Sequence, residues 1–204
     1  MNPLVLVALG LVGLAAALSL ASERVRPERV LLVGDSHSEA PWTFGGRVVA
    51  KLEEAGIPLV VRKGHRGKGV GWYNTSGTLR DEVASVRPDL LIVALGGNDA
   101  GRFQEADYAA ALREFVDTAK AGGIKHIIWF GPPRSDKGLA YKQPARQKVA
   151  NWQAKHLPGM GVQWHDSMRL TEDLPTRDGV HYEHGEYEVW ASRAVAGPLQ
   201  RAVA

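Results

Sequence analysis

The chain has 204 residues, of which 45% are hydrophobic and 23% are charged, a balance typical of a folded globular protein. It carries 25 lysine and arginine residues against 22 aspartate and glutamate residues, and a net charge of +3 is too small to indicate nucleic-acid binding. Cysteine is absent, which excludes disulfides, a thiolate nucleophile and cysteine-ligated metal centres.

The N-terminal segment, residues 3–21, contains no charged side chain and is rich in leucine, valine and alanine. About 20 such residues suffice for a helix that crosses a bilayer. We therefore expect residues 1–22 to be an apolar helix that serves as a membrane anchor or as a signal peptide, for which Ser19-Leu20-Ala21 is an acceptable cleavage site. We expect a protein that is exported to the periplasm or outside the cell, or anchored in a membrane, although the arginines that follow the segment favour a cytoplasmic domain.

Residues 23–204 are expected to form one domain, in which short apolar strands alternate with amphipathic helices. The strand segments are apolar throughout, which predicts a parallel sheet covered by helices on both faces. The predicted fold class is α/β, with three α/β/α layers and a doubly wound, mainly parallel five-stranded sheet. In chain order the sequence predicts strand 30–33, helix 47–55, strand 58–61, a glycine-rich loop, helix 79–86, strand 89–95, helix 106–121, strand 126–130, helix 146–156, strand 161–164 and helix 187–195.

Three polar segments lie where such a sheet binds its ligands, beyond the carboxyl ends of the strands. Gly34-Asp35-Ser36-His37-Ser38 follows the first strand, where a glycine allows a sharp turn and a serine can expose its hydroxyl. Gly96-Gly97-Asn98-Asp99 follows the third strand and offers a neutral amide donor. In Asp178-Gly179-Val180-His181 the acid can fix the tautomer of the histidine. Each of the first two segments is also typical of a helix cap or a turn, but together the three predict one crevice.

With these segments in this order, the chain resembles the SGNH/GDSL hydrolases, which are named for four blocks carrying Ser, Gly, Asn and His. The resemblance covers most of the chain after the N-terminal segment and implies the flavodoxin-like SGNH hydrolase fold. It implies a catalytic triad of Ser36, Asp178 and His181. It also implies an oxyanion hole formed by the N–H groups of Ser36 and of a glycine in the second block, together with the Asn98 amide.

The second block is the least regular of the four. Residues 63–72 contain four glycines, of which Gly67 fits the family's oxyanion glycine best by position and Gly69 comes second. The usual asparagine near the start of this loop is absent, and three basic residues lie within it. His37 stands where the family often has leucine, and we expect it to line the substrate pocket together with Trp72 and Pro132.

The resemblance implies a serine esterase that needs no metal and no organic cofactor. Aromatic and basic residues near the expected crevice favour a short-chain ester of a carbohydrate or a cell-wall glycan, such as an O-acetyl ester, over a long lipid. The expected partners are therefore a small-molecule or glycan ester, with no nucleic acid and with membrane contact only through the N-terminal segment. We expect a monomer.

Three alternatives follow from the same residues. An O-acyltransferase would use the same triad to move the acyl group onto a sugar. A non-catalytic cell-envelope or carbohydrate-binding module predicts a broken triad, against which the complete set of residues argues. A metal site built from Asp178, His181, His184 and Glu186 would have no standard ligand spacing, and His184 is expected to begin the last helix.

Overall fold

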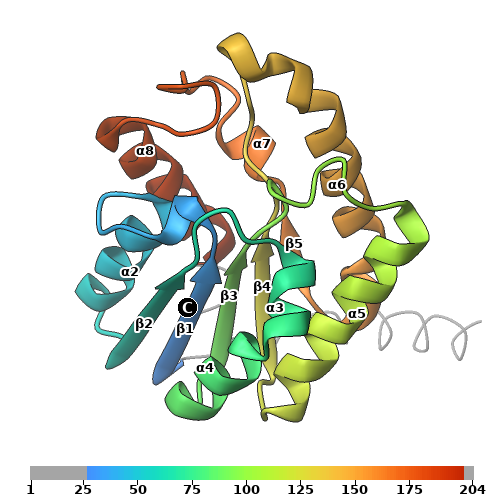
Figure 1. The fold of residues 1–204 in the computed structure, drawn as a ribbon. Coiled ribbons are helices and arrows are strands. Elements are labelled where there is room, and N and C mark those ends of the chain that lie inside the picture. Colours follow the sequence, from blue (N-terminus) through green and yellow to red (C-terminus); the bar gives the residue numbers. More distant parts are fainter. Residues whose placement is uncertain (1–26, 200–204) are drawn as a thin grey trace, which may run out of the picture.

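The computed structural model describes residues 27–199, so the expected anchor or signal peptide lies outside the described residues. At its centre is a sheet with strand order β2-β1-β3-β4-β5, in which every neighbouring pair is parallel (Figure 1). This confirms the predicted α/β class and the five-stranded, doubly wound sheet. The strands are β1 (Arg29–Gly34), β2 (Leu59–Gly64), β3 (Leu90–Ala94), β4 (His126–Phe130) and β5 (Gln163–His165).

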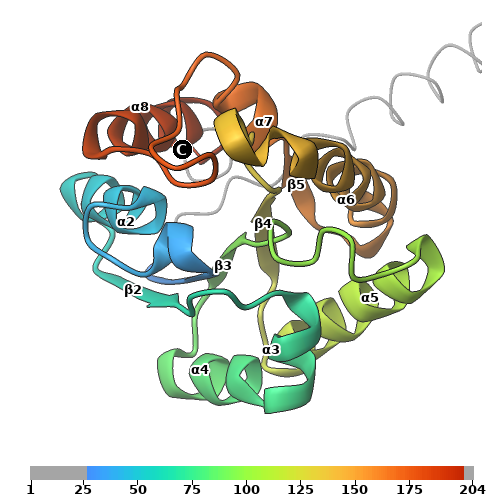
Figure 2. The same cartoon turned by 45° about the horizontal axis from the view of Figure 1, so that its top comes forward.

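Helices cover both faces of the sheet (Figures 1 and 2). One face is covered by α2 (Phe44–Glu54) and α8 (His184–Ala194), and the other by α3 (Val70–Ser76), α4 (Thr78–Val86), α5 (Glu105–Ala121) and α6 (Gln143–His156). Within residues 27–199, no helix is both long and apolar enough to cross a bilayer. The shorter elements are η1 (Ser36–Ser38), η2 (Lys137–Lys142), η3 (Pro158–Met160), α7 (Ser167–Leu170) and η4 (Val195–Leu199).

The sheet is buried on both faces because successive side chains of its central strands enter different layers. In β1, Leu31 and Val33 belong to the cluster under α3–α6, while Val30 and Leu32 belong to the cluster under α2 and α8. All four are fully buried. This explains why the central strands read as continuous apolar runs, and it fixes the carboxyl ends of β1 and β3 side by side beneath the loops that carry the polar segments.

The helix α3 lies where the sequence predicts only a glycine-rich loop. Glycine disfavours helix in isolation, and the segment from Gly69 to Gly77 contains three of them. Tertiary packing overrides this preference: Tyr73 is 1% exposed, and its hydroxyl donates to the carbonyl oxygen of Gly34 at 2.9 Å. The helix is therefore stabilised by its contact with the end of β1, which no local pattern reveals.

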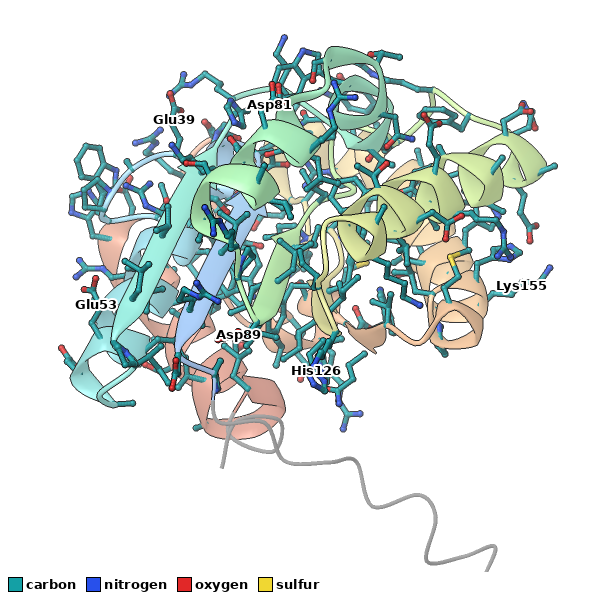
Figure 3. The ribbon with its side chains drawn as sticks, turned by 90° about the horizontal axis from the view of Figure 1, so that it is seen from below. Glu39, Glu53, Asp81, Asp89, His126 and Lys155 are labelled. Carbon is teal, nitrogen blue, oxygen red and sulfur yellow. The ribbon has the colours of Figure 1, made fainter. Side chains whose placement is uncertain are left out.

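The amino-terminal ends of the strands carry a separate groove of about 490 Å³. Figure 3 shows the molecule from this end and labels two of its lining residues, Asp89 and His126. The Asp89 carboxylate accepts hydrogen bonds from the N–H groups of Glu28 and Arg29, both at 2.9 Å. Asp89 thus fixes the start of β1, and the groove lies at the opposite end of the sheet from the three polar segments.

Candidate active site

The turn that carries Ser36 follows β1 directly and forms η1. The Asp35 carboxylate caps this short helix by accepting a hydrogen bond from His37 N at 2.9 Å. Gly34 has to be a glycine, since a Cβ there would overlap the Ser38 hydroxyl. Ser36 is half-buried, whereas Asp35 and His37 are each 3% exposed. The turn therefore directs the Ser36 side chain outward while its neighbours stay in the interior.

The loop before α8 brings a histidine and an aspartate to Ser36. Ser36 Oγ lies 3.0 Å from His181 Nε2, and His181 Nδ1 lies 2.8 Å from Asp178 Oδ2. The other carboxylate oxygen, Oδ1, accepts from the backbone N–H groups of Val180 at 3.0 Å and His181 at 2.8 Å. These distances suit a chain of hydrogen bonds in which a serine nucleophile contacts a histidine base and the base contacts an acid that orients it.

The loop strongly favours the ionised form of the Asp178 carboxyl group. Burial alone would raise the pKa of its carboxyl group, but the N–H of His181, the His181 ring and the N–H of Val180 hold that pKa well below its usual range. An ionised Asp178 accepts a hydrogen bond from His181 Nδ1–H, and this tautomer leaves the lone pair of Nε2 directed toward Ser36.

Asn98 follows β3, and its side chain contacts the turn that carries Ser36. Its Nδ2 donates to Asp35 Oδ2 at 3.0 Å and to the carbonyl oxygen of Lys68 at 3.1 Å. The amide is therefore held against the turn that carries Ser36, and it also holds the glycine-rich loop. In this arrangement both amide hydrogens of Asn98 already have protein acceptors.

The two candidate glycines of the loop have different surroundings. Gly67 is exposed and has a φ of 72°, and a Cβ there would meet no atom within 4 Å. Gly69 is buried, and a Cβ there would lie 2.7 Å from Asp99 Cγ. The carbonyl that Asn98 holds belongs to the Lys68–Gly69 peptide. Gly69 is thus the glycine that packs against the Asn98-Asp99 segment, which position along the sequence did not favour.

Asp99 is a further member of this cluster whose role the sequence did not reveal. Its carboxylate accepts from the N–H of Val70, the first residue of α3, at 3.0 and 3.2 Å. Burial raises the pKa of Asp99 to about 6, and the Val70 hydrogen bond opposes that rise. The residue fixes the start of α3 and so the end of the glycine-rich loop. A buried acid directly after the asparagine was the only available signal.

The three residues expected to line the substrate pocket lie elsewhere. His37 is in the interior, where its Nδ1 lies 2.9 Å from the hydroxyl of Tyr187. Pro132 is buried, and Trp72 packs against the His65 ring at 5.0 Å between centroids. The pocket that contains Ser36 has a volume of about 70 Å³ and is lined by a different set: Ser36, Glu39, Ala40, Trp42, Thr43, Arg66, Arg177, His181, Tyr182, His184 and Tyr187.

The residues of the alternative metal site do not form a metal centre in the described part of the chain. Within residues 27–199, no group of three or more histidine and acidic side chains could hold a metal ion. His184 begins α8, as the sequence predicts, and its ring lies 5.6 Å from that of Trp42. The pair forms one wall of the pocket that contains Ser36.

Comparisons with known proteins agree with the fold and identify the family. The model of the GDSL-like lipase/acylhydrolase family matches residues 32–186. Among solved structures, a catalytic mutant of an acetylxylan esterase from Geobacillus stearothermophilus has a TM-score of 0.67 at 17% identity, with 82% of this chain and 92% of that chain covered. A carbohydrate acetylesterase family member from Sinorhizobium meliloti has a TM-score of 0.68 at 14% identity, with 86% and 99% covered. No curated protein matches the chain.

Proposed function

The chain belongs to the GDSL-like lipase/acylhydrolase family and is an ester hydrolase, and on this premise we propose that it removes acetyl groups from carbohydrate esters. The proposed triad is Ser36, His181 and Asp178. The single observation that carries the proposal is the continuous chain of contacts from Ser36 Oγ to His181 Nε2 at 3.0 Å and from His181 Nδ1 to Asp178 Oδ2 at 2.8 Å.

In the proposed reaction, Ser36 Oγ attacks the acyl carbonyl carbon while His181 Nε2 takes the hydroxyl proton. The C–O bond to the sugar then breaks, and His181 returns the proton to the departing alkoxide. Water attacks the acyl-enzyme in the same way and releases acetate and Ser36. Asp178 orients His181 and stabilises the imidazolium in both halves of the reaction.

The oxyanion would accept hydrogen bonds from the N–H of Ser36, from the Asn98 amide and from a glycine N–H of the loop. Because Asn98 Nδ2 donates to Lys68 O, an oxyanion would have to share that amide hydrogen with Lys68 O or take its place as acceptor. Gly67 was the first choice from the sequence, but the contact between Gly69 and the Asn98-Asp99 segment supports Gly69 as the glycine donor.

The size and lining of the pocket support acetyl as the acyl group and a sugar as the alcohol. The pocket beside Ser36 is small, about 70 Å³, which favours a two-carbon acyl group. Trp42, 48% exposed, offers an apolar plane at the pocket wall, and Arg66 and Arg177 offer hydrogen-bond donors nearby. Proteins of similar fold include an acetylxylan esterase and a carbohydrate acetylesterase family member, which also supports acetyl as the acyl group.

The test is acetate release from acetylated xylo-oligosaccharides by the purified protein without residues 1–22. We expect acetate release, and we expect p-nitrophenyl acetate to be cleaved much faster than p-nitrophenyl octanoate. Preference for the octanoate would contradict the acetyl assignment. If the protein cleaves p-nitrophenyl acetate but releases no acetate from acetylated glycans, it is an esterase, and a carbohydrate ester is not its substrate.

Replacement of Asn98 by alanine should lower kcat for p-nitrophenyl acetate by about 10²–10³-fold, the usual effect of removing one oxyanion donor. Asn151→Ala is the matched control, because Asn151 is an exposed asparagine of α6 that bonds only to Gln147 among the described contacts. Steady-state kinetics of the two variants checks the expectation. Equal rates for Asn98→Ala and Asn151→Ala would remove Asn98 from the oxyanion hole.

Replacement of Trp42 by alanine should raise KM for acetylated xylo-oligosaccharides by about fivefold, since an aromatic contact contributes ~1 kcal/mol. It should leave kcat/KM for p-nitrophenyl acetate nearly unchanged, because that substrate has no sugar ring. Tyr141→Ala is the control, since Tyr141 is an aromatic residue that is 72% exposed and does not line this pocket. A Trp42→Ala enzyme with unchanged KM for the oligosaccharide would show that the sugar does not stack on Trp42.

A further inference from the structure

A buried arginine that neither the triad nor the oxyanion hole uses lies beneath the nucleophile turn. Arg146 belongs to α6 and is 5% exposed. Its Nη1 donates to the carbonyl oxygen of Pro133 at 3.3 Å, and among the described residues its Nε has no hydrogen-bond partner. Burial of a guanidinium is costly unless an opposite charge is close. The surroundings of Arg146 therefore have to supply such a charge.

That charge is the carboxylate of Asp35. A Cβ added to Gly97 would lie 3.4 Å from Arg146 Nη2 and 3.8 Å from Asp35 Oδ2, so both charged groups border the same glycine. Asp35 is itself buried at 3% exposure. Two opposite charges in a region of low dielectric attract each other strongly even without direct contact.

Asp35 connects the two parts of the proposed oxyanion hole. Its Oδ1 accepts from His37 N at 2.9 Å and so fixes the turn that carries Ser36. Its Oδ2 accepts from Asn98 Nδ2 at 3.0 Å and so fixes the amide. Both bonds require acceptor oxygens. A protonated carboxyl would direct an O–H donor at one of these N–H donors, and one of the two bonds would be lost.

We propose that Arg146 is a positioning residue for the oxyanion hole, whose buried charge keeps Asp35 ionised so that Asp35 can hold Asn98 and the Ser36 turn together. The inference rests on the proposed serine mechanism. Arg146 does not touch the substrate. It acts through Asp35, whose carboxylate orients the N–H groups of His37 and of the Asn98 amide.

The charges around Asp35 give the sign of the effect. Burial raises the pKa of Asp35 to about 6, and the His37 N–H, the charge of Arg146 and His181 lower it, while Asp99 raises it. The phenol groups of Tyr73 and Tyr187 also face Asp35, and burial keeps both neutral by raising their pKa values well above the usual range. Removal of the Arg146 charge should raise the pKa of Asp35 further, by about one unit. Asp35 would then be about half protonated at pH 7.

The experiment measures kcat/KM for p-nitrophenyl acetate from pH 5.5 to pH 9 in the wild type, Arg146→Gln, Arg146→Lys and Gln153→Leu. In Arg146→Gln the acid limb should move up by about one pH unit, so that the rate near pH 6 falls about fivefold while the rate at pH 9 stays close to that of the wild type. Arg146→Lys keeps the charge and should follow the wild-type profile.

Gln153→Leu is the structural control. Gln153 is also a fully buried polar residue of α6, but its Nε2 donates to Leu95 O at 3.0 Å and to the Tyr108 hydroxyl at 2.8 Å, away from Asp35. Its loss should lower the thermal midpoint without moving the pH profile.

The possible outcomes separate the inference from the proposed function. An unshifted acid limb in Arg146→Gln, or the same shift in Gln153→Leu, would overturn the inference. If Arg146→Gln does not fold, Arg146→Lys decides, because a shift of a full unit with the charge retained would also contradict it. A wild-type protein that does not hydrolyse p-nitrophenyl acetate at any pH would overturn the proposed function itself.

Discussion

Replacement of Ser36 by alanine is expected to lower kcat for p-nitrophenyl acetate by about 10⁴-fold or more, with the fold intact. The hydroxyl that lies 3.0 Å from His181 Nε2 is the proposed nucleophile, and alanine has no atom that can form the acyl-enzyme. Ser36 is half-buried at the end of a capped turn, so loss of one oxygen should leave the thermal midpoint nearly unchanged. The residual rate would come from binding and from the remaining oxyanion donors.

Ser38→Ala is the matched control for Ser36→Ala. Ser38 lies in the same η1 turn and is fully buried, and its Oγ has no hydrogen-bond partner within the described residues. Its removal should cost little activity or stability, since an unpartnered buried hydroxyl contributes no bond. A fluorophosphonate reagent should add one label to the wild type and to Ser38→Ala, read by intact mass, and none to Ser36→Ala. Wild-type rates in Ser36→Ala would place the nucleophile elsewhere.

The fold could be predicted from the sequence because each layer leaves a local pattern. The segments that became β1 and β3 are buried on both faces, and only apolar residues suit such positions. The helix α3 left no such pattern, because it depends on Tyr73, whose ring and hydroxyl contact the end of a strand almost forty residues earlier in the chain. Long-range contacts of this kind become visible only when the chain is folded.

The proposed triad could be read from the sequence because its members lie in short segments with fixed internal spacing. Asp178 and His181 are three residues apart, and the same loop that separates them also supplies the N–H donors of the Asp178 carboxylate. The pocket walls could not be read in this way. Trp42 and His184 lie far apart in the sequence and meet only because α2 and α8 pack together.

His37 and the loop glycines show why position next to a motif is a poor guide to orientation. His37 follows Ser36, the proposed nucleophile, yet the η1 turn directs its ring into the layer beneath α8, where burial holds its pKa well below the usual range. Counting from the end of β2 favoured Gly67, but a Cβ at Gly67 would meet no atom within 4 Å, whereas Gly69 packs against Asp99. In both cases, residues one or two positions apart along the backbone differ in whether they face solvent or the interior.

Asp178→Asn is expected to lower kcat for p-nitrophenyl acetate by about 10⁴-fold, with little change in KM. The amide oxygen of the substituted side chain can still accept from the N–H groups of Val180 and His181, so the loop should keep its shape. The amide nitrogen would then face His181 Nδ1 as a donor. The imidazole would have to present a lone pair at Nδ1 and carry its proton on Nε2, toward Ser36, where it could no longer act as the base.

Asp173→Asn is the control that separates this effect from the loss of a charge in the same region. Asp173 also lies between α7 and α8, and its hydrogen bond with Arg193 lowers its pKa to about 2. Within residues 27–199, the side-chain hydrogen bonds of Asp173 go to Arg193 and not to the proposed triad. The Asp173→Asn variant should therefore keep the wild-type kcat. Comparable losses in the two variants would assign the effect to the net charge of the loop. A large loss in Asp178→Asn alone would assign it to the tautomer of His181, which is the orienting role that the 2.8 Å contact supports.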